Sequence, residues 1–252
     1  MPPRPRSDRR PGRRVTLSRE QIVETAIAVL DRDGIGGLTL RGLAAELGGG
    51  LGSVYWHVDG KAELIELACD ELIGRALEAA GPPGGAAADV PSPPMEVDLE
   101  TSDPVVLDAV DRLRRMAMAL FWQLDRHPWL AVQSQAAFAG GSNGLLVWER
   151  LGRPLADLGL TPRQQFHGST ALMGYVLGVA SVMAEQGAGA DRERSQEEQL
   201  EDVVEGWLAD APEELTWVRS VADEFVHHDD VAQFSAGLDL LLLGLVRQAL
   251  AG

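Results

Sequence analysis

Residues 50–61 read GLGSVYWHVDGK and bring together four side chains that can bind an anion. Tyr55, Trp56 and His57 are consecutive, and Lys61, the only lysine of the chain, follows four residues after His57. Hydroxyl, ring N–H and ammonium groups are donors that proteins offer to phosphate oxygens. The alternative is that the aromatic rings fill a core at the end of a helix. These twelve residues therefore indicate either a surface for a polyanion or ordinary packing.

The charge distribution favours an anionic partner at one end of the chain. The formal net charge is −16, but residues 1–64 carry ten basic and eight acidic side chains, whereas the other 188 residues carry twelve basic and 30 acidic ones. The first 14 residues contain six arginines and one aspartate. An acidic body with a basic beginning is typical of a protein that touches nucleic acid with one end. A solvated basic tail gives the same pattern, so both interpretations of the arm, residues 1–17, stay open.

Composition predicts a globular cytoplasmic protein. Hydrophobic residues make up 45% of the 252, enough for a substantial core. The single cysteine, Cys69, excludes an internal disulfide framework and fits a reducing compartment. The apolar stretch at 238–246 is too short to span a bilayer, and no apolar run follows the first arginines as a secretory signal requires. We therefore expect no membrane partner.

The first third of the chain has the pattern of short helices. Ser18-Arg-Glu-Gln21 has the form of a capping box, and Gly34 is expected to end the helix that it starts. Thr39 can cap a second helix, which the glycines at 48–50 end, and a short third helix follows, carrying Val54. A fourth helix is expected from about 61 to 80. Two short helices joined by a glycine turn are typical of a helix-turn-helix, whose second helix enters the major groove.

The remainder is expected to be helical as well, which makes the fold class all-α. Six of the fourteen prolines lie in a flexible insert at about 81–104, and a second mobile loop is expected at 187–199. Asp103-Pro104 and Thr161-Pro162 have the form of helix starts. Further helices are predicted at 105–124, near 129–139, and at 143–158, 162–185, 212–228 and 231–250.

The segment 17–65 resembles the DNA-binding domain of the Tet repressor family of bacterial regulators. The matching residues are Gly34 with Gly37-Leu38-Thr39, Arg41-Gly-Leu-Ala44, Leu47-Gly48, and Val54-Tyr55-Trp56-His57-Val58 with Lys61 and Leu64. The Tyr-Trp-His triplet is most similar to the tetracycline-responsive branch. Residues 234–245 resemble, more weakly, the last helix of the same family. The resemblance implies a three-helix helix-turn-helix domain at 18–64, followed by a ligand-binding and dimerisation domain at 65–252.

The resemblance also implies roles for the residues of the opening segment. Phosphate contacts are implied for Tyr55, His57, Lys61 and Thr39, and base-edge contacts for Arg41 and Ser53. The recognition helix departs from the family at Leu51 and Gly52, where polar residues or proline are frequent. Leu51 can contact only apolar groups such as a thymine methyl. For Trp56 we prefer a packing role that joins this domain to the rest of the chain.

The resemblance implies a homodimer that binds a palindromic double-stranded operator and is released by a small-molecule inducer. The last two long helices would form the dimer interface. Large apolar side chains are the candidates for the pocket of an apolar or aromatic ligand, although a dry core contains the same types: Phe121, Trp122, Trp129, Phe138, Trp148, Phe166, Met173 and Val176.

No catalytic residue, cofactor or metal site is predicted. The run His227-His228-Asp229-Asp230 cannot converge on one ion from a helix, because neighbouring side chains point about 100° apart. We interpret it as one helix end followed by the cap of the next. No nucleophile–base signature or phosphate-binding glycine loop supports an enzyme. The alternatives to a ligand-responsive repressor are a constitutive architectural DNA-binding protein and, less favoured, an all-helical enzyme.

Overall fold

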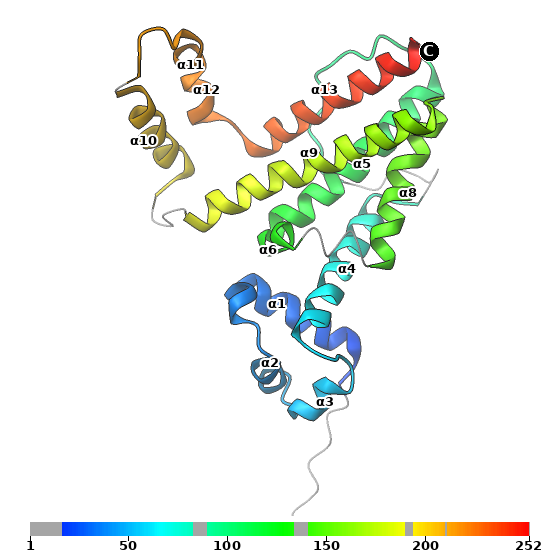
Figure 1. Ribbon diagram of the computed structural model, residues 1–252, viewed down its shortest axis with the longest axis vertical. Coiled ribbons are helices and arrows are strands. Elements are labelled where there is room, and N and C mark those ends of the chain that lie inside the picture. Colours follow the sequence, from blue (N-terminus) through cyan, green and yellow to red (C-terminus); the bar gives the residue numbers. More distant parts are fainter. Residues whose placement is uncertain (1–16, 83–89, 134–140, 190–193, 210, 252) are drawn as a thin grey trace, which may run out of the picture. The chain divides into compact units, whose positions relative to one another are not determined.

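The computed structural model describes residues 17–82, 90–133, 141–189, 194–209 and 211–251 (Figure 1). Every regular element in these ranges is an α-helix, which confirms the predicted all-α class. The chain divides into two compact units, one ending at Ala68 and the other beginning at Cys69. The predicted arm lies outside the described residues, apart from Leu17.

The first unit contains α1 (Arg19–Gly37), α2 (Leu40–Glu46), α3 (Leu51–Tyr55) and the first turns of α4 (Lys61–Ala79). The capping box at α1 is present: the Ser18 hydroxyl accepts from the Gln21 N–H at 3.1 Å, and the Gln21 side chain accepts from the Ser18 N–H at 3.0 Å. Gly34 kinks α1 at φ 66° instead of ending it. Fully buried apolar side chains from all four helices form the core: Ile22, Leu30, Leu43, Val54 and Leu64.

The main body of the second unit contains α5 (Pro104–Arg126), α6 (Pro128–Val132), α8 (Ser142–Asp157), α9 (Pro162–Gly189) and α13 (Asp230–Leu250). The helix α5 is central, since α6, α8, α9 and α13 all pack against it. Its start is the predicted one: the Asp103 carboxylate caps the Val105 N–H at 2.9 Å. By length and hydropathy alone, α9 could cross a membrane; in this structure it packs against α5, α6, α8 and α13.

Three helices form a smaller group in the second unit (Figure 1). They are α10 (Gln196–Ala209), α11 (Thr216–Ser220) and α12 (Ala222–His227), and both α10 and α11 pack against α12. The predicted loop at 187–199 is therefore wrong at both ends, because α9 continues to Gly189 and α10 begins at Gln196. The predicted helix at 212–228 is two short helices. A signal for α10 was present, since Ser195 and Glu198 form a capping box.

The end of the proline-rich insert is held against the helices. We call residues 90–103 the strap; they form no helix or strand. The Trp122 indole donates to the Pro91 carbonyl at 2.7 Å, Arg114 donates to the Pro93 carbonyl at 2.7 Å, and Arg247 pairs with Glu100 at 2.6 Å. Prolines lack an N–H but keep a carbonyl acceptor, and the strap is bound through such carbonyls. The sequence predicted a flexible insert throughout, but these contacts hold the strap against α5 and α13.

A charged pair joins α5 and α13 in the interior of the second unit. Asp239 on α13 is 1% exposed, and its Oδ1 accepts from the Arg114 Nε on α5 at 2.8 Å. Arg114 also donates to the Ser235 hydroxyl at 2.6 Å and to that of Ser92. One guanidinium thus joins α5, α13 and the strap, using the several donors that arginine offers in a fixed plane.

Candidate nucleic-acid interface and ligand site

The α2 and α3 helices form the predicted helix-turn-helix. Gly48 makes the turn at φ 64°, a conformation that favours glycine, and the Gly49 N–H donates to the Ala44 carbonyl at 2.9 Å. Ala44 is buried at this crossing, as is Val54 on the inner side of α3. The small side chain of Ala44 and the inward-facing Val54 fix α3 on α2 and leave the opposite side of α3 to the solvent.

The residues predicted to meet base edges face the solvent. Arg41, near the start of α2, is exposed, as are Gly52 and Ser53 on α3, while Leu51 is half-buried. None of the hydrogen bonds described for this unit involves the guanidinium of Arg41 or the hydroxyl of Ser53. Both side chains are therefore available to a partner, which is the condition for direct readout of bases.

The residues predicted to meet phosphate are also accessible. Tyr55 is 53% exposed at the end of α3, and His57 follows it half-exposed. The Thr39 hydroxyl accepts from the Gly42 N–H at 3.1 Å and caps α2. Because a hydroxyl can accept and donate at once, its hydrogen remains free to reach a phosphate oxygen.

Trp56 does not belong to the core of the first unit. Its side chain is 86% exposed, the largest exposure among the large apolar residues that face solvent in the described chain. The predicted contact of this ring with the second unit stays a prediction. Its position between Tyr55 and His57 places an indole N–H among the candidate phosphate donors.

Lys61 has a role that the sequence did not indicate. Its ammonium donates to the backbone carbonyl of Ile35, beyond the kink of α1, at 2.6 Å. This bond ties the first turn of α4 to the end of α1. An ammonium carries three hydrogens, so two remain for a phosphate.

We expect Lys61→Ala to make DNA binding less dependent on salt. Losing one phosphate contact should make the log–log slope of affinity against salt shallower by about 0.9 for each neutralised phosphate. Fluorescence anisotropy across a salt series measures this slope. Lys61→Arg, which retains the charge, should keep it. If Lys61 only supports α1, the slope of Lys61→Ala will equal that of the unmodified protein.

Seven of the eight predicted ligand residues lie in the described part of the chain, and they differ in exposure. Phe121, Trp129, Met173 and Val176 are buried, Trp122 and Trp148 are half-buried, and Phe166 is 63% exposed; Phe138 lies outside the described residues. Phe121 stacks on Phe234 of α13 with ring centroids 4.1 Å apart and meets Trp122 edge-on at 5.5 Å. In this structure Phe121 therefore fills the contact between α5 and α13.

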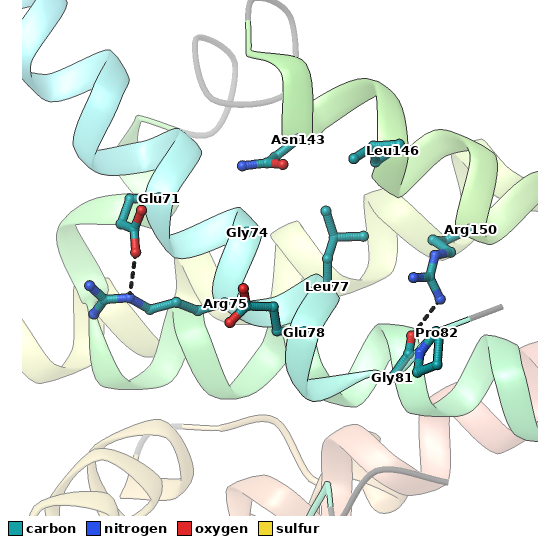
Figure 2. Close-up of a pocket in the computed structure, with 10 residues that line it drawn as sticks. All are labelled: Glu71, Gly74, Arg75, Leu77, Glu78, Gly81, Pro82, Asn143, Leu146 and Arg150. Atoms are coloured by element: carbon teal, nitrogen blue, oxygen red, sulfur yellow. Dashed lines mark hydrogen bonds and ion pairs between the residues drawn. The ribbon is translucent and has the colours of Figure 1, made fainter. Parts of the chain in front are cut away.

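Two of the cavities on the second unit bear on the predicted ligand site. A cavity of about 240 Å³ is lined by Trp122 with Ala79, Val90, Pro91, Ala119, Gln123 and Arg126. Of the predicted ligand residues that the structure describes, Trp122 alone lines it. A larger groove of about 520 Å³ lies between α4 and α8 and has mixed polar and apolar walls (Figure 2). None of the described ligand candidates lines this groove.

The His227–Asp230 run has the predicted structural role. His227 ends α12, and the Asp229 carboxylate caps α13 by accepting from the Ala232 N–H at 2.7 Å. Within the described ranges, no three His, Cys, Asp or Glu side chains are arranged to hold a metal ion.

The long helices α9 and α13 carry exposed apolar surface. Phe166 and Val182 on α9 are 63% and 54% exposed, and Leu240 on α13 is 64% exposed. Gly174 and Gly178 on α9 are also exposed, and a Cβ atom on either would meet nothing within 4 Å. Another protein molecule could contact these exposed side chains on α9 and α13.

Comparisons with known proteins agree with the geometry. Residues 108–249 match the family described as Tetracyclin repressor-like, C-terminal domain. The HTH-type transcriptional repressor DrrR1 of Streptomyces coeruleorubidus is 30% identical over 174 residues, 68% of this chain and 56% of that protein. The chain thus spans little more than half the length of this curated relative, and 60% of a regulator from Saccharopolyspora erythraea.

Solved structures share the fold over nearly the whole chain. The transcriptional regulator SCO7222, a TetR from Streptomyces coelicolor, is 34% identical, with a TM-score of 0.72 over 92% of this chain and 98% of that one. ActR of Streptomyces coelicolor, solved in complex with actinorhodin, is 24% identical, with a TM-score of 0.67 over the same shares. The helix-turn-helix of the first unit and the matched helices of the second establish that this chain belongs to the Tet repressor family.

Proposed function

We propose that this protein is a ligand-responsive transcriptional repressor that binds a two-fold symmetric operator as a homodimer. The observation that carries the proposal is the solvent-facing side of α2 and α3. Arg41, Ser53 and Tyr55 are exposed there on a helix-turn-helix held together by Ala44 and Val54. Ser53 and Tyr55 lie on α3, the helix that this motif places in the major groove, and Arg41 lies on α2 beside it; together they offer base-reading and phosphate-binding donors.

A dimer supplies the length of contact that one short helix lacks. The α3 helix has only five residues, so tight binding needs two copies on half-sites one DNA turn apart. The exposed apolar residues of α9 and α13 are the candidate surface between the two copies. Such a regulator acts in the cytoplasm, on DNA of the nucleoid.

The inducer is proposed to be an apolar or aromatic small molecule bound in the second unit. Support comes from the aromatic and methionine side chains of α5, α6 and α9, which suit broad apolar ligands. Actinorhodin, found in the complex of the structural relative ActR, is a reasonable first probe.

Selection from a random duplex library tests the DNA-binding part of the proposal. We expect enrichment of a palindromic sequence with half-site centres about 10–11 base pairs apart, bound by two or more protomers in native mass spectrometry. Failure to enrich any sequence, or binding of a single protomer to an asymmetric one, would contradict a dimeric operator-binding protein.

Arg41→Ala should then separate base reading from phosphate binding. We expect a loss of about 1–3 kcal/mol on the selected duplex and a smaller loss on random DNA, because a bidentate contact with guanine is lost only where the guanine is present. Competition binding with the two duplexes measures the difference. Equal losses on both would place Arg41 on the DNA backbone.

A further inference from the structure

The second half of α4 is attached to the start of α8 by one carboxylate. Asp70 Oδ1 accepts from the Asn143 N–H at 3.0 Å, and Oδ2 accepts from the Asn143 amide at 3.2 Å and the Ser142 hydroxyl at 3.4 Å. The Asn143 amide also donates to the Asp70 carbonyl at 2.8 Å. The cap position of α8 is Gly141, which offers no side-chain cap. Asp70 therefore supplies from α4 the negative charge that a helix N-terminus favours.

Two glycines allow this close approach. A Cβ on Gly141 would lie 2.1 Å from Asp70 Oδ1, and a Cβ on Gly74 would lie 2.9 Å from the Asn143 amide nitrogen. Contacts this short do not occur between real atoms, so the arrangement requires glycine at Gly141 and is tight at Gly74. At this end α4 and α8 are therefore closely packed as well as hydrogen-bonded.

A second attachment lies at the other end of the same stretch of α4. The Arg150 guanidinium of α8 donates to the Gly81 carbonyl at 2.5 Å, and the Arg115 guanidinium of α5 donates to the Ala80 carbonyl at 3.1 Å. Both cations lie at the C-terminus of α4, where the helix dipole favours positive charge. Figure 2 shows the groove between the two attachments, with the Arg150–Gly81 bond at one end and Asn143 near the other.

We infer that Asp70 is a positioning residue that makes the second half of α4 and the start of α8 move as one body, so that changes at the ligand-binding helices reach the DNA-binding unit. The inference rests on the proposed function. The α4 helix is continuous from Lys61 in the first unit to Ala79 in the second, and Asp70 lies at the beginning of its second part. A displacement of α8 that acts on Asp70 therefore acts on the helix that carries Lys61.

Coupling between two sites is reciprocal, which permits a test without the inducer. If α8 acts on α4, then DNA bound to the first unit must act on α8. The probe is the duplex selected from the random library, and the readout is hydrogen–deuterium exchange of the peptide covering residues 141–151. In the unmodified protein we expect the duplex to change this exchange by about 5-fold or more.

Asp70→Ala should keep duplex binding and lose the duplex-dependent change in residues 141–151. A merely structural role would alter exchange equally with and without duplex, and the difference between the two states would survive. Asn143→Ala, which removes the two amide bonds from the α8 side, is the second variant if Asp70→Ala folds poorly. Glu71→Ala is the matched control, because Glu71 pairs with Arg75 on α4 itself at 3.1 Å.

The outcomes separate this inference from the proposed function. A protein that binds no duplex contradicts the proposed function and the inference with it. A protein that binds duplex without any change in residues 141–151, or whose Asp70→Ala and Asn143→Ala variants retain the full change, contradicts the inference alone.

Discussion

Arg114→Met is expected to lower the free energy of unfolding by about 3–5 kcal/mol, since it leaves the carboxylate of Asp239 buried without its cation. Asp239 is 1% exposed, and Arg114 is its only charged partner among the described residues. Its other carboxylate oxygen, Oδ2, has no hydrogen-bond partner there. The substitution also removes the bonds to Ser235 and to the Pro93 carbonyl. The strap should loosen at the same time.

Urea denaturation of the variant and its control measures this loss. Arg153→Met is the control, because Arg153 and its partner Glu149, both on α8, are 70% and 67% exposed. Pairs of this kind contribute about 0–1 kcal/mol. The double variant Arg114→Met with Asp239→Leu should recover most of the stability, since apolar replacement of a buried pair is often neutral. Equal midpoints for Arg114→Met and Arg153→Met would contradict a buried pair.

Deleting residues 1–14 should weaken DNA binding about tenfold or more at 50 mM salt, because six arginines per protomer leave the DNA-binding end of the chain. The salt dependence should become shallower by about 0.9 for each phosphate that these arginines neutralise. Thermal unfolding should change little, since a segment this rich in charge and proline cannot bury much apolar surface.

A full-length variant with the six arginines replaced by lysine controls for length and charge. It should retain most of the affinity and the salt slope, whereas the truncated protein loses both. A truncated protein with unchanged affinity in the same titration would support the alternative of a solvated tail.

The features predicted correctly from the sequence are those determined by neighbouring residues. Ser18, Thr39 and Asp103 cap the helices expected of them, because a cap acts on N–H groups two or three residues away. The helix-turn-helix follows from the same kind of local information, with Gly48 at its turn. The α10 helix was not predicted. The glycines and charged residues at 187–199 indicated a loop, although the Ser195–Glu198 capping box indicated a helix start.

The features not predicted depend on residues far apart in the chain. Arg114 and Asp239 are separated by 125 residues, and Asp70 and Asn143 by 73. Composition predicts a loop for the strap, but the anchors that hold it come from α5 and α13. Residue type likewise does not distinguish a core from a pocket: Phe121 stacks on Phe234, whereas Trp122 lines a cavity.

Linkage between ligand and DNA is the most direct test of a ligand-responsive repressor. A compound that binds the protein, sought by thermal-shift screening that begins with actinorhodin, is titrated calorimetrically with and without the selected duplex. The duplex is then titrated with and without the compound. We predict that each weakens the binding of the other by the same factor, typically about 5–150-fold. Identical affinities in the presence and absence of the other partner would contradict the account and favour a constitutive DNA-binding protein.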